Sequence, residues 1–137
     1  KNQMTNDFMV FARIESFILN KNLADAMNRA KKYVKAGVDG IMIHSKSKDP
    51  KEIFKYAKAF RKFNKKIPLV SVPSTYNHVT EKNLIDNGFN IVIYANQLLR
   101  ASYYSMSKVA KEILTNSRAK ESENNLISIK EIVNLIP

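Results

Sequence analysis

The residues best suited to chemistry in this sequence are an arginine and a histidine that each end a short apolar run. Arg13 ends the run 8–13 (FMVFAR), and His44 follows the run 41–43 (IMI). Arginine offers a planar fork of donors that suits a carboxylate or phosphate, and histidine donates one hydrogen bond when neutral and two when charged. On neighbouring parallel strands, both side chains would lie at one rim and form a site for a small dianion.

Each of these residues also has an ordinary structural interpretation. Arg13 can pair with Glu15 or with a helix end, and His44 can be a structural histidine with locally satisfied hydrogen bonds. Spacing alone leaves both interpretations open.

Three further polar residues follow apolar runs at the same predicted rim. Asn77 and His78 come after the run 69–72, and Asn96 comes after the run 90–94. They are weaker ligand-binding candidates, because asparagine in a loop more often caps or turns the chain than binds a ligand.

Several kinds of site lack a sequence signature. The chain has no cysteine, which excludes disulfides and thiolate zinc sites, and its three glycines form no phosphate-binding loop. Catalytic Mg²⁺ needs carboxylates near a dry cavity, and Glu15 is nearly the only acid close to the rim. We therefore expect no metal ligand on this chain.

An alternation of apolar runs and amphipathic segments positions these residues. The runs predict strands at 8–13, 40–44, 69–72 and 90–94, each followed by a segment with helical spacing of apolar residues. Such alternation predicts an α/β fold with a parallel sheet and right-handed crossovers. Four units form either an open sheet or half of a (β/α)8 barrel, and the unprotected strand edges favour the half-barrel.

Two helix starts have clear sequence signals. Asn22 is a predicted N-cap with Asp25 three residues later. Asp49 is another, with Pro50 at the first helical position and Glu52 at the third.

The predicted domain organisation has three parts. Residues 1–115 form the half-barrel, 116–125 a polar linker, and 126–137 an amphipathic C-terminal helix. The apolar stripe of that helix needs a partner surface, so we expect it to pack on another chain.

The net charge of +11 raises the question of nucleic acid, but no nucleic-acid motif accompanies it. Solvated helix faces, or acidic residues elsewhere on a longer polypeptide, account for the charge. We expect no nucleic acid partner, no membrane span and a cytoplasmic location, because no apolar run approaches the length of a span and no signal-peptide core is visible.

Several strings together resemble the second half of the phosphoenolpyruvate mutase family, in the isocitrate lyase superfamily. They include DFMVFARIESF, IHSKSKDPKEI, PLVSVPSTYNHVTEKNL and IVIYANQLLR. The resemblance implies the second four units of a (β/α)8 barrel, an isomerase that interconverts phosphoenolpyruvate and phosphonopyruvate, and Mg²⁺ in the parent enzyme.

The same resemblance implies roles for particular residues. Arg13 matches the family's ARxE arginine and His44 its IHS histidine, both of which contact the phosphoryl end of the ligand, with Glu15, Asn77, His78 and Asn96 as further substrate-binding candidates. The family's Mg²⁺ ligands and mobile lid come from the first half of the barrel. We therefore expect a fragment that is inactive alone.

Two alternatives remain open at this stage. Phosphonopyruvate hydrolase, or another member of the superfamily, is similar in this half of the barrel. A non-catalytic basic assembly or binding module belongs to a different class. The expected macromolecular partner is a further copy of this chain or a complementary N-terminal half.

Overall fold

The computed structural model describes residues 7–135 of the chain. It divides the chain into two compact units, Lys1–Ala95 and Asn96–Pro137, and each unit is described here by itself. The prediction of one domain over residues 1–115 stays a prediction.

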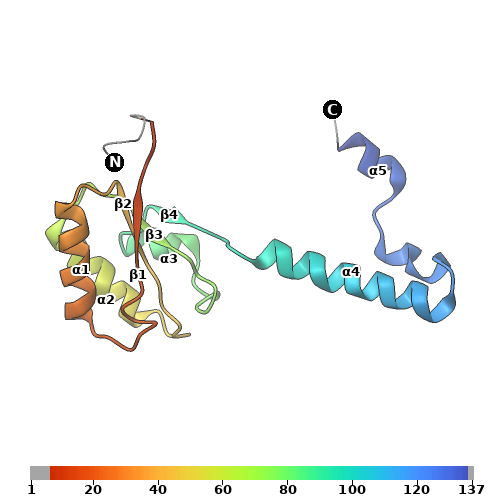
Figure 1. Ribbon diagram of the computed structural model, residues 1–137, viewed down its shortest axis with the longest axis horizontal. Helices are drawn as coiled ribbons and strands as arrows, with labels where there is room; N and C mark the ends of the chain where they lie inside the picture. The colour runs from red at the N-terminus through yellow and green to blue at the C-terminus, as the bar shows by residue number, and fades with distance from the viewer. Residues whose placement is uncertain (1–6, 136–137) are drawn as a thin grey trace. The chain divides into compact units, whose positions relative to one another are not determined.

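The first unit contains a parallel sheet whose four strands lie in chain order (Figure 1). All three neighbouring pairs are parallel, which confirms the predicted strand order and direction. The strands are β1 (Phe11–Ile14), β2 (Gly40–Ile43), β3 (Leu69–Ser71) and β4 (Ile91–Val92).

The outer strands are shorter than the apolar runs predicted. The first run was expected to pair from residue 8, but β1 begins at Phe11, and β4 has two residues where five were expected. A ladder can form only where a neighbouring strand runs alongside, so an apolar run at a sheet edge extends beyond its paired residues. Single backbone bonds continue the β3–β4 pairing, from Asn90 N to Leu69 O and from Ile93 N to Ser71 O.

Helices of the first unit cover one face of this sheet. Alternate strand residues, such as Ile41 and Ile43, are fully buried in a core that also contains Ala26, Tyr56 and other helix residues. This alternation follows from the two-residue period of a strand. The helices are α1 (Leu23–Lys35), α2 (Lys51–Phe63) and α3 (Glu81–Asp86).

One of the two predicted N-caps is confirmed and the other is wrong. The Asn22 side chain accepts a hydrogen bond from the Asp25 N–H at 3.0 Å, as expected. Helix α2, however, begins at Lys51 with Pro50 in the cap position, which has no side-chain acceptor. Asp49 Oδ1 accepts from the Lys51 N–H at 3.0 Å, so it turns the chain one residue before the cap.

The second unit is helical. Its elements are α4 (Gln97–Asn116), the 3₁₀ helix η1 (Lys120–Asn125) and α5 (Ile129–Asn134). The segment predicted as a linker therefore carries η1, tied to α4 by a hydrogen bond from Lys108 Nζ to Asn125 Oδ1 at 2.8 Å. Of the predicted C-terminal helix 126–137, residues 136 and 137 lie outside the described residues.

Backbone conformation and local hydrogen bonds mark the ends of these helices. Ser117, with φ of 51°, follows the last residue of α4. Ser128 and Glu131 form a reciprocal capping box at the start of α5. No helix within residues 7–135 combines the length and apolar character needed to cross a membrane.

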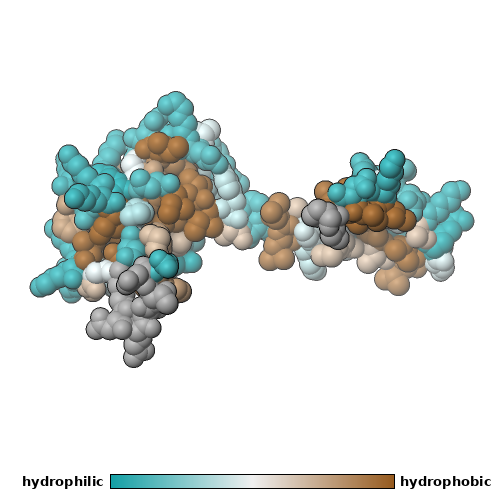
Figure 2. All heavy atoms as spheres, turned by 90° about the horizontal axis from the view of Figure 1, so that it is seen from above, coloured by the Kyte–Doolittle hydropathy of each residue, from teal (hydrophilic) through white to brown (hydrophobic). Residues whose placement is uncertain are grey.

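Apolar side chains gather on the surface of the second unit (Figure 2). Helix α4 has no buried residue. Among its exposed apolar residues are Leu98, Leu99, Tyr103, Tyr104 and Met106. The unit by itself therefore does not supply a surface that covers α4.

Candidate functional site

Arg13 and His44 meet at the carboxyl ends of the first two strands. Arg13 Nη2 lies 3.2 Å from His44 Nδ1. The register explains the meeting, because Arg13 is opposite Met42 and His44 follows two residues later on the same face of β2. The His44 N–H also donates to Ile14 O at 3.2 Å, which extends the β1–β2 pairing up to the site.

Glu15 completes this cluster. The Nε of Arg13 donates a hydrogen bond to the Glu15 carboxylate. The structure therefore contains both contacts that the sequence suggested for this arginine. Arg13 keeps half of its side chain exposed, at 53%. A guanidinium held at two sides by Glu15 and His44, with an open surface, is oriented and still accessible to an anion.

The surroundings of His44 favour its neutral form. Partial burial lowers the pKa of the imidazole, the positive charge of Arg13 lowers it further, and Glu15 opposes the effect in part. Arginine is only a donor, so the Nδ1 that faces it acts as the acceptor. The neutral ring then carries its proton on Nε2, which leaves one N–H donor for a ligand beside the charge of Arg13.

Within the first unit, the candidates Asn77 and His78 do not join this cluster. Asn77 and His78 are exposed on the loop after β3. The pKa of Asp49 lies below its ordinary value mainly because the Lys51 N–H donates to it, and the charge of His78 adds a small effect. Asn96 belongs to the second unit, where its Oδ1 is buried without a hydrogen-bond partner among the described residues.

Two contacts near the site were not anticipated from the sequence. The exposed Lys46 donates from Nζ to Ile18 O at 3.1 Å. Ser45 is buried and its hydroxyl donates to the Glu52 carboxylate. Glu52 fits a helix-capping signal in the sequence, and that role gives no indication of its contact with Ser45. The signal that the sequence does offer is Ser45 itself, a small polar residue just after a strand.

The described residues do not fit a Mg²⁺ ion. Within 7–135, no group of three or more histidines, aspartates or glutamates is placed to hold a metal. Glu15, the acid at the rim, is already paired with Arg13. Mg²⁺ requires oxygen ligands, commonly carboxylates, and the carboxylate of this cluster is engaged by Arg13.

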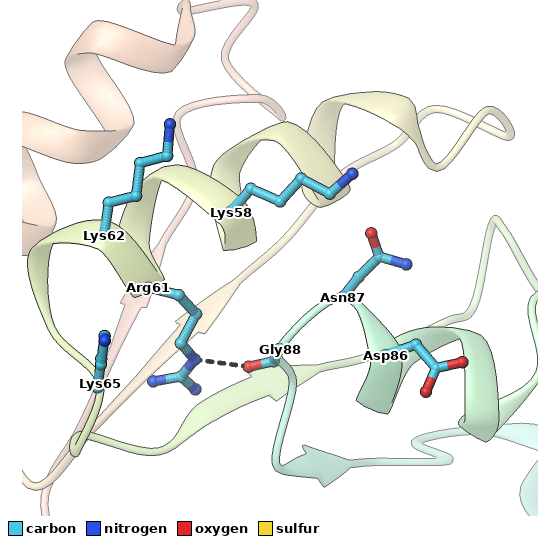
Figure 3. A pocket seen from close by; sticks show the side chains of 7 residues that line it. All are labelled: Lys58, Arg61, Lys62, Lys65, Asp86, Asn87 and Gly88. Carbon is cyan, nitrogen blue, oxygen red and sulfur yellow. Dashed lines mark hydrogen bonds between the residues drawn. The ribbon is translucent and has the colours of Figure 1, made fainter.

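A basic depression of about 430 Å³ lies at the opposite end of the strands, where α2 and α3 end (Figure 3). Arg61 occupies its centre and donates to backbone carbonyls, from Nε to Gly88 O at 2.7 Å and from Nη1 to Ile67 O at 2.8 Å. These bonds satisfy carbonyls at the amino ends of β3 and β4. Cations are also favourable at helix C-termini, which explains Lys62 in the last turn of α2 without a ligand.

Comparison with known proteins places the chain in a family. The family model described as phosphoenolpyruvate phosphomutase matches residues 1–114. The chain is 34% identical over 133 residues to the phosphoenolpyruvate phosphomutase of Tetrahymena pyriformis. It is 36% identical over 130 residues to the phosphonopyruvate hydrolase of Variovorax sp. (strain Pal2). These matches cover 97% and 94% of this chain but only 43% and 44% of the relatives.

Solved structures give the same result. The crystal structure of a phosphoenolpyruvate phosphomutase from Streptomyces platensis subsp. rosaceus matches with a TM-score of 0.87 and 32% identity, over 97% of this chain and 45% of that one. A phosphonopyruvate hydrolase solved in complex with oxalate and Mg²⁺ matches with a TM-score of 0.85 and 35% identity, over 97% of this chain and 46% of that one.

The four parallel βα units are thus half of the barrel seen in these relatives, as the sequence predicted. The chain spans less than half the length of the relatives it matches. With a family match over residues 1–114, the chain belongs to the phosphoenolpyruvate phosphomutase family of the isocitrate lyase superfamily.

Proposed function

We propose that this chain carries the phosphoryl-binding half of a site that interconverts phosphoenolpyruvate and phosphonopyruvate. The observation that supports this most is the contact between Arg13 Nη2 and His44 Nδ1, 3.2 Å apart on the sheet face that α1–α3 leave uncovered. Two donors of different kinds converge there, and the family relationship supplies the reaction.

The chemistry asked of these residues is electrostatic. Phosphoryl transfer requires positioning and stabilisation of charge on the equatorial oxygens rather than covalent help from the protein. The guanidinium of Arg13 supplies positive charge, and the Nε2–H of neutral His44 supplies a donor. Glu15 keeps the guanidinium oriented without removing it from solvent.

The remaining part of the site has to come from outside these residues. We propose that Mg²⁺ and the ligand carboxylate are held by a complementary barrel half, because the described residues offer no metal ligand group. The phosphonopyruvate hydrolase relative was solved with Mg²⁺ and oxalate, which is consistent with this division. A further copy of this chain is the alternative partner, through the uncovered sheet face or the apolar surface of α4.

A phosphonopyruvate hydrolase is the second candidate. The chain is 36% identical to one such enzyme and 34% identical to a phosphomutase, so identity does not separate them. Both reactions begin with a phosphoryl group on carbon. In the mutase the phosphoryl group moves to the substrate's own oxygen, whereas in the hydrolase water accepts it and the products are pyruvate and phosphate.

A complementation assay tests the proposal. The purified chain is mixed with the missing N-terminal portion of the Tetrahymena relative and given phosphonopyruvate, with Mg²⁺ present. We expect phosphoenolpyruvate from the mixture and no product from either part alone. Pyruvate and phosphate in place of phosphoenolpyruvate would identify the hydrolase. Turnover by this chain alone would contradict the division of the site.

A further inference from the structure

The loop that carries His44 is tied down by its neighbour, Ser45. This serine is only 1% exposed, although it lies two residues beyond the end of β2. Its hydroxyl donates to the Glu52 carboxylate and accepts from the Ser47 N–H at 2.9 Å. Its carbonyl oxygen accepts from Thr75 Oγ1 at 3.0 Å. Ser45 is therefore the point where the loop after β2, the start of α2 and the loop after β3 are joined.

Among these partners, Glu52 is the one built into a rigid element. It lies in the first turn of α2, a 13-residue helix whose Ile53, Tyr56, Ala57 and Phe60 are buried in the core. Thr75 and Ser47 lie on loops. A carboxylate accepts a stronger hydrogen bond from a hydroxyl than a neutral group does. The hydrogen bond from Ser45 to Glu52 thus fixes the backbone next to His44 relative to α2.

We propose that Glu52 is a positioning residue for His44. Through the Ser45 hydroxyl it fixes the loop after β2 and so keeps the imidazole Nδ1 against Arg13. The proposal rests on the proposed function only in treating the Arg13–His44 pair as the phosphate-binding group. Glu52 itself need not touch any ligand.

The test compares four variants of the intact chain, one of them a control, with the unchanged protein. Glu52→Ala removes the acceptor, and Ser45→Ala removes the same hydrogen bond from the other side. Glu52→Gln retains a carbonyl acceptor and should restore the contact. Glu81→Ala is the matched control, because it removes an exposed glutamate from the first turn of another helix of the same unit.

Nuclear magnetic resonance of the imidazole groups supplies both measurements. The chain has two histidines, so His78 serves as an internal reference for His44. The first measurement is the pKa of each imidazole, and the second is the inorganic phosphate concentration that half-saturates the His44 shift. Circular dichroism melts establish that each variant is folded.

We expect Glu52→Ala and Ser45→Ala to move the pKa of His44 upwards, toward the ordinary value of about 6.5, because the loosened ring is more solvated and farther from Arg13. Phosphate affinity should fall about tenfold, because a loosened His44 donor is no longer held at one place; a full misplacement of about 1 Å can cost about 100-fold in catalysis. Glu52→Gln and Glu81→Ala should stay within twofold of the unchanged chain, and His78 should not respond.

Each failure has a distinct meaning. If folded Glu52→Ala or Ser45→Ala keeps both the pKa of His44 and the half-saturating phosphate concentration, the positioning role is wrong. If Glu52→Gln behaves like Glu52→Ala while Ser45→Ala behaves like the unchanged chain, the carboxylate acts by charge and not through Ser45, which also overturns the proposal. If the unchanged chain shows no His44 response to phosphate, the proposed function fails, and the pKa measurement still decides the role of Glu52.

Discussion

The two ends of the sheet each hold an arginine, and the two are used differently. Arg61, at the amino end, donates mainly to backbone, to the carbonyls of Gly88, Asn64 and Ile67, and also to the side chain of Asn90. Arg13, at the carboxyl end, donates to the side chains of Glu15 and His44. Backbone carbonyls fixed between a helix end and the start of a strand cannot easily move away to admit a ligand, whereas side chains can. The partners of an arginine therefore indicate its role better than its exposure does.

The partial burial of Arg61 supports the same distinction. Burial lowers the pKa of Arg61, with Tyr56 opposing the effect, so this guanidinium is charged in a partly desolvated place and depends on its carbonyl partners. Removing Arg61 should cost stability. Removing Arg13 should cost ligand binding and little else.

The largest expected effect is that of Arg13→Ala on catalysis. In the complemented enzyme this change should lower kcat/KM. The decrease should correspond to a loss of about 3–4 kcal/mol of transition-state stabilisation, as for loss of a charge-stabilising donor. Steady-state kinetics with phosphonopyruvate measures it. Turnover that survives both Arg13→Ala and His44→Ala within about tenfold would refute the assignment. The stability of the chain should change by less than about 1 kcal/mol, since the ion pair is exposed.

Arg61→Ala should produce the opposite result. It leaves the Gly88 and Ile67 carbonyls without their donor, at a cost of about 2 kcal/mol in the free energy of unfolding. Urea unfolding followed by circular dichroism measures this loss. Lys62→Ala, an exposed change on the next residue, is the control and should stay within about 0.5 kcal/mol. An equal decrease in the free energy of unfolding from both changes would show that the hydrogen bonds of Arg61 do not stabilise the fold.

Gly40→Ala tests the sheet beneath the site. A Cβ at Gly40 would lie 2.0 Å from Cε1 of Phe11, so the ring must move. We expect a destabilisation of about 1–2 kcal/mol, typical of overpacking, and partial recovery in the double variant Gly40→Ala with Phe11→Leu. Thermal melts of the single and double variants provide the measurement. A double variant less stable than Gly40→Ala alone would contradict the steric explanation.

The smallest effect is a pH dependence of stability. Because the pKa of His44 is lowered in the folded chain, the unfolded chain binds more protons in the interval below about 6.5. The contribution of His44 is fully present above that pH and is lost as the pH falls through the folded-state pKa. Urea midpoints between pH 5 and 7 should show this slope, and His44→Gln should reduce it while His78→Gln leaves it unchanged. An unchanged slope in His44→Gln would exclude the effect.

Much of this comparison could be predicted from the sequence. Apolar runs and helical spacing predict the four parallel strands, and strand parity then brings Arg13 and His44 to one rim. What the sequence did not predict depends on tertiary contacts. Arg61 lies on a helix rich in exposed lysines, and only the fold shows that carbonyls from the segments preceding β3 and β4 converge on it. Glu52 fits a capping signal, and its partner Ser45 becomes evident only when α2 is placed beside the loop after β2.

The most direct measurement of the central claim is phosphate binding to the intact chain in three forms, followed by the imidazole resonances. In the unchanged chain, His44 should shift saturably with phosphate and His78 should not. The shift should disappear in Arg13→Ala and persist in Arg61→Ala, since only Arg13 lies beside His44. A His44 response that survives Arg13→Ala, or one that is lost equally in both variants, would contradict the division of roles between the two arginines.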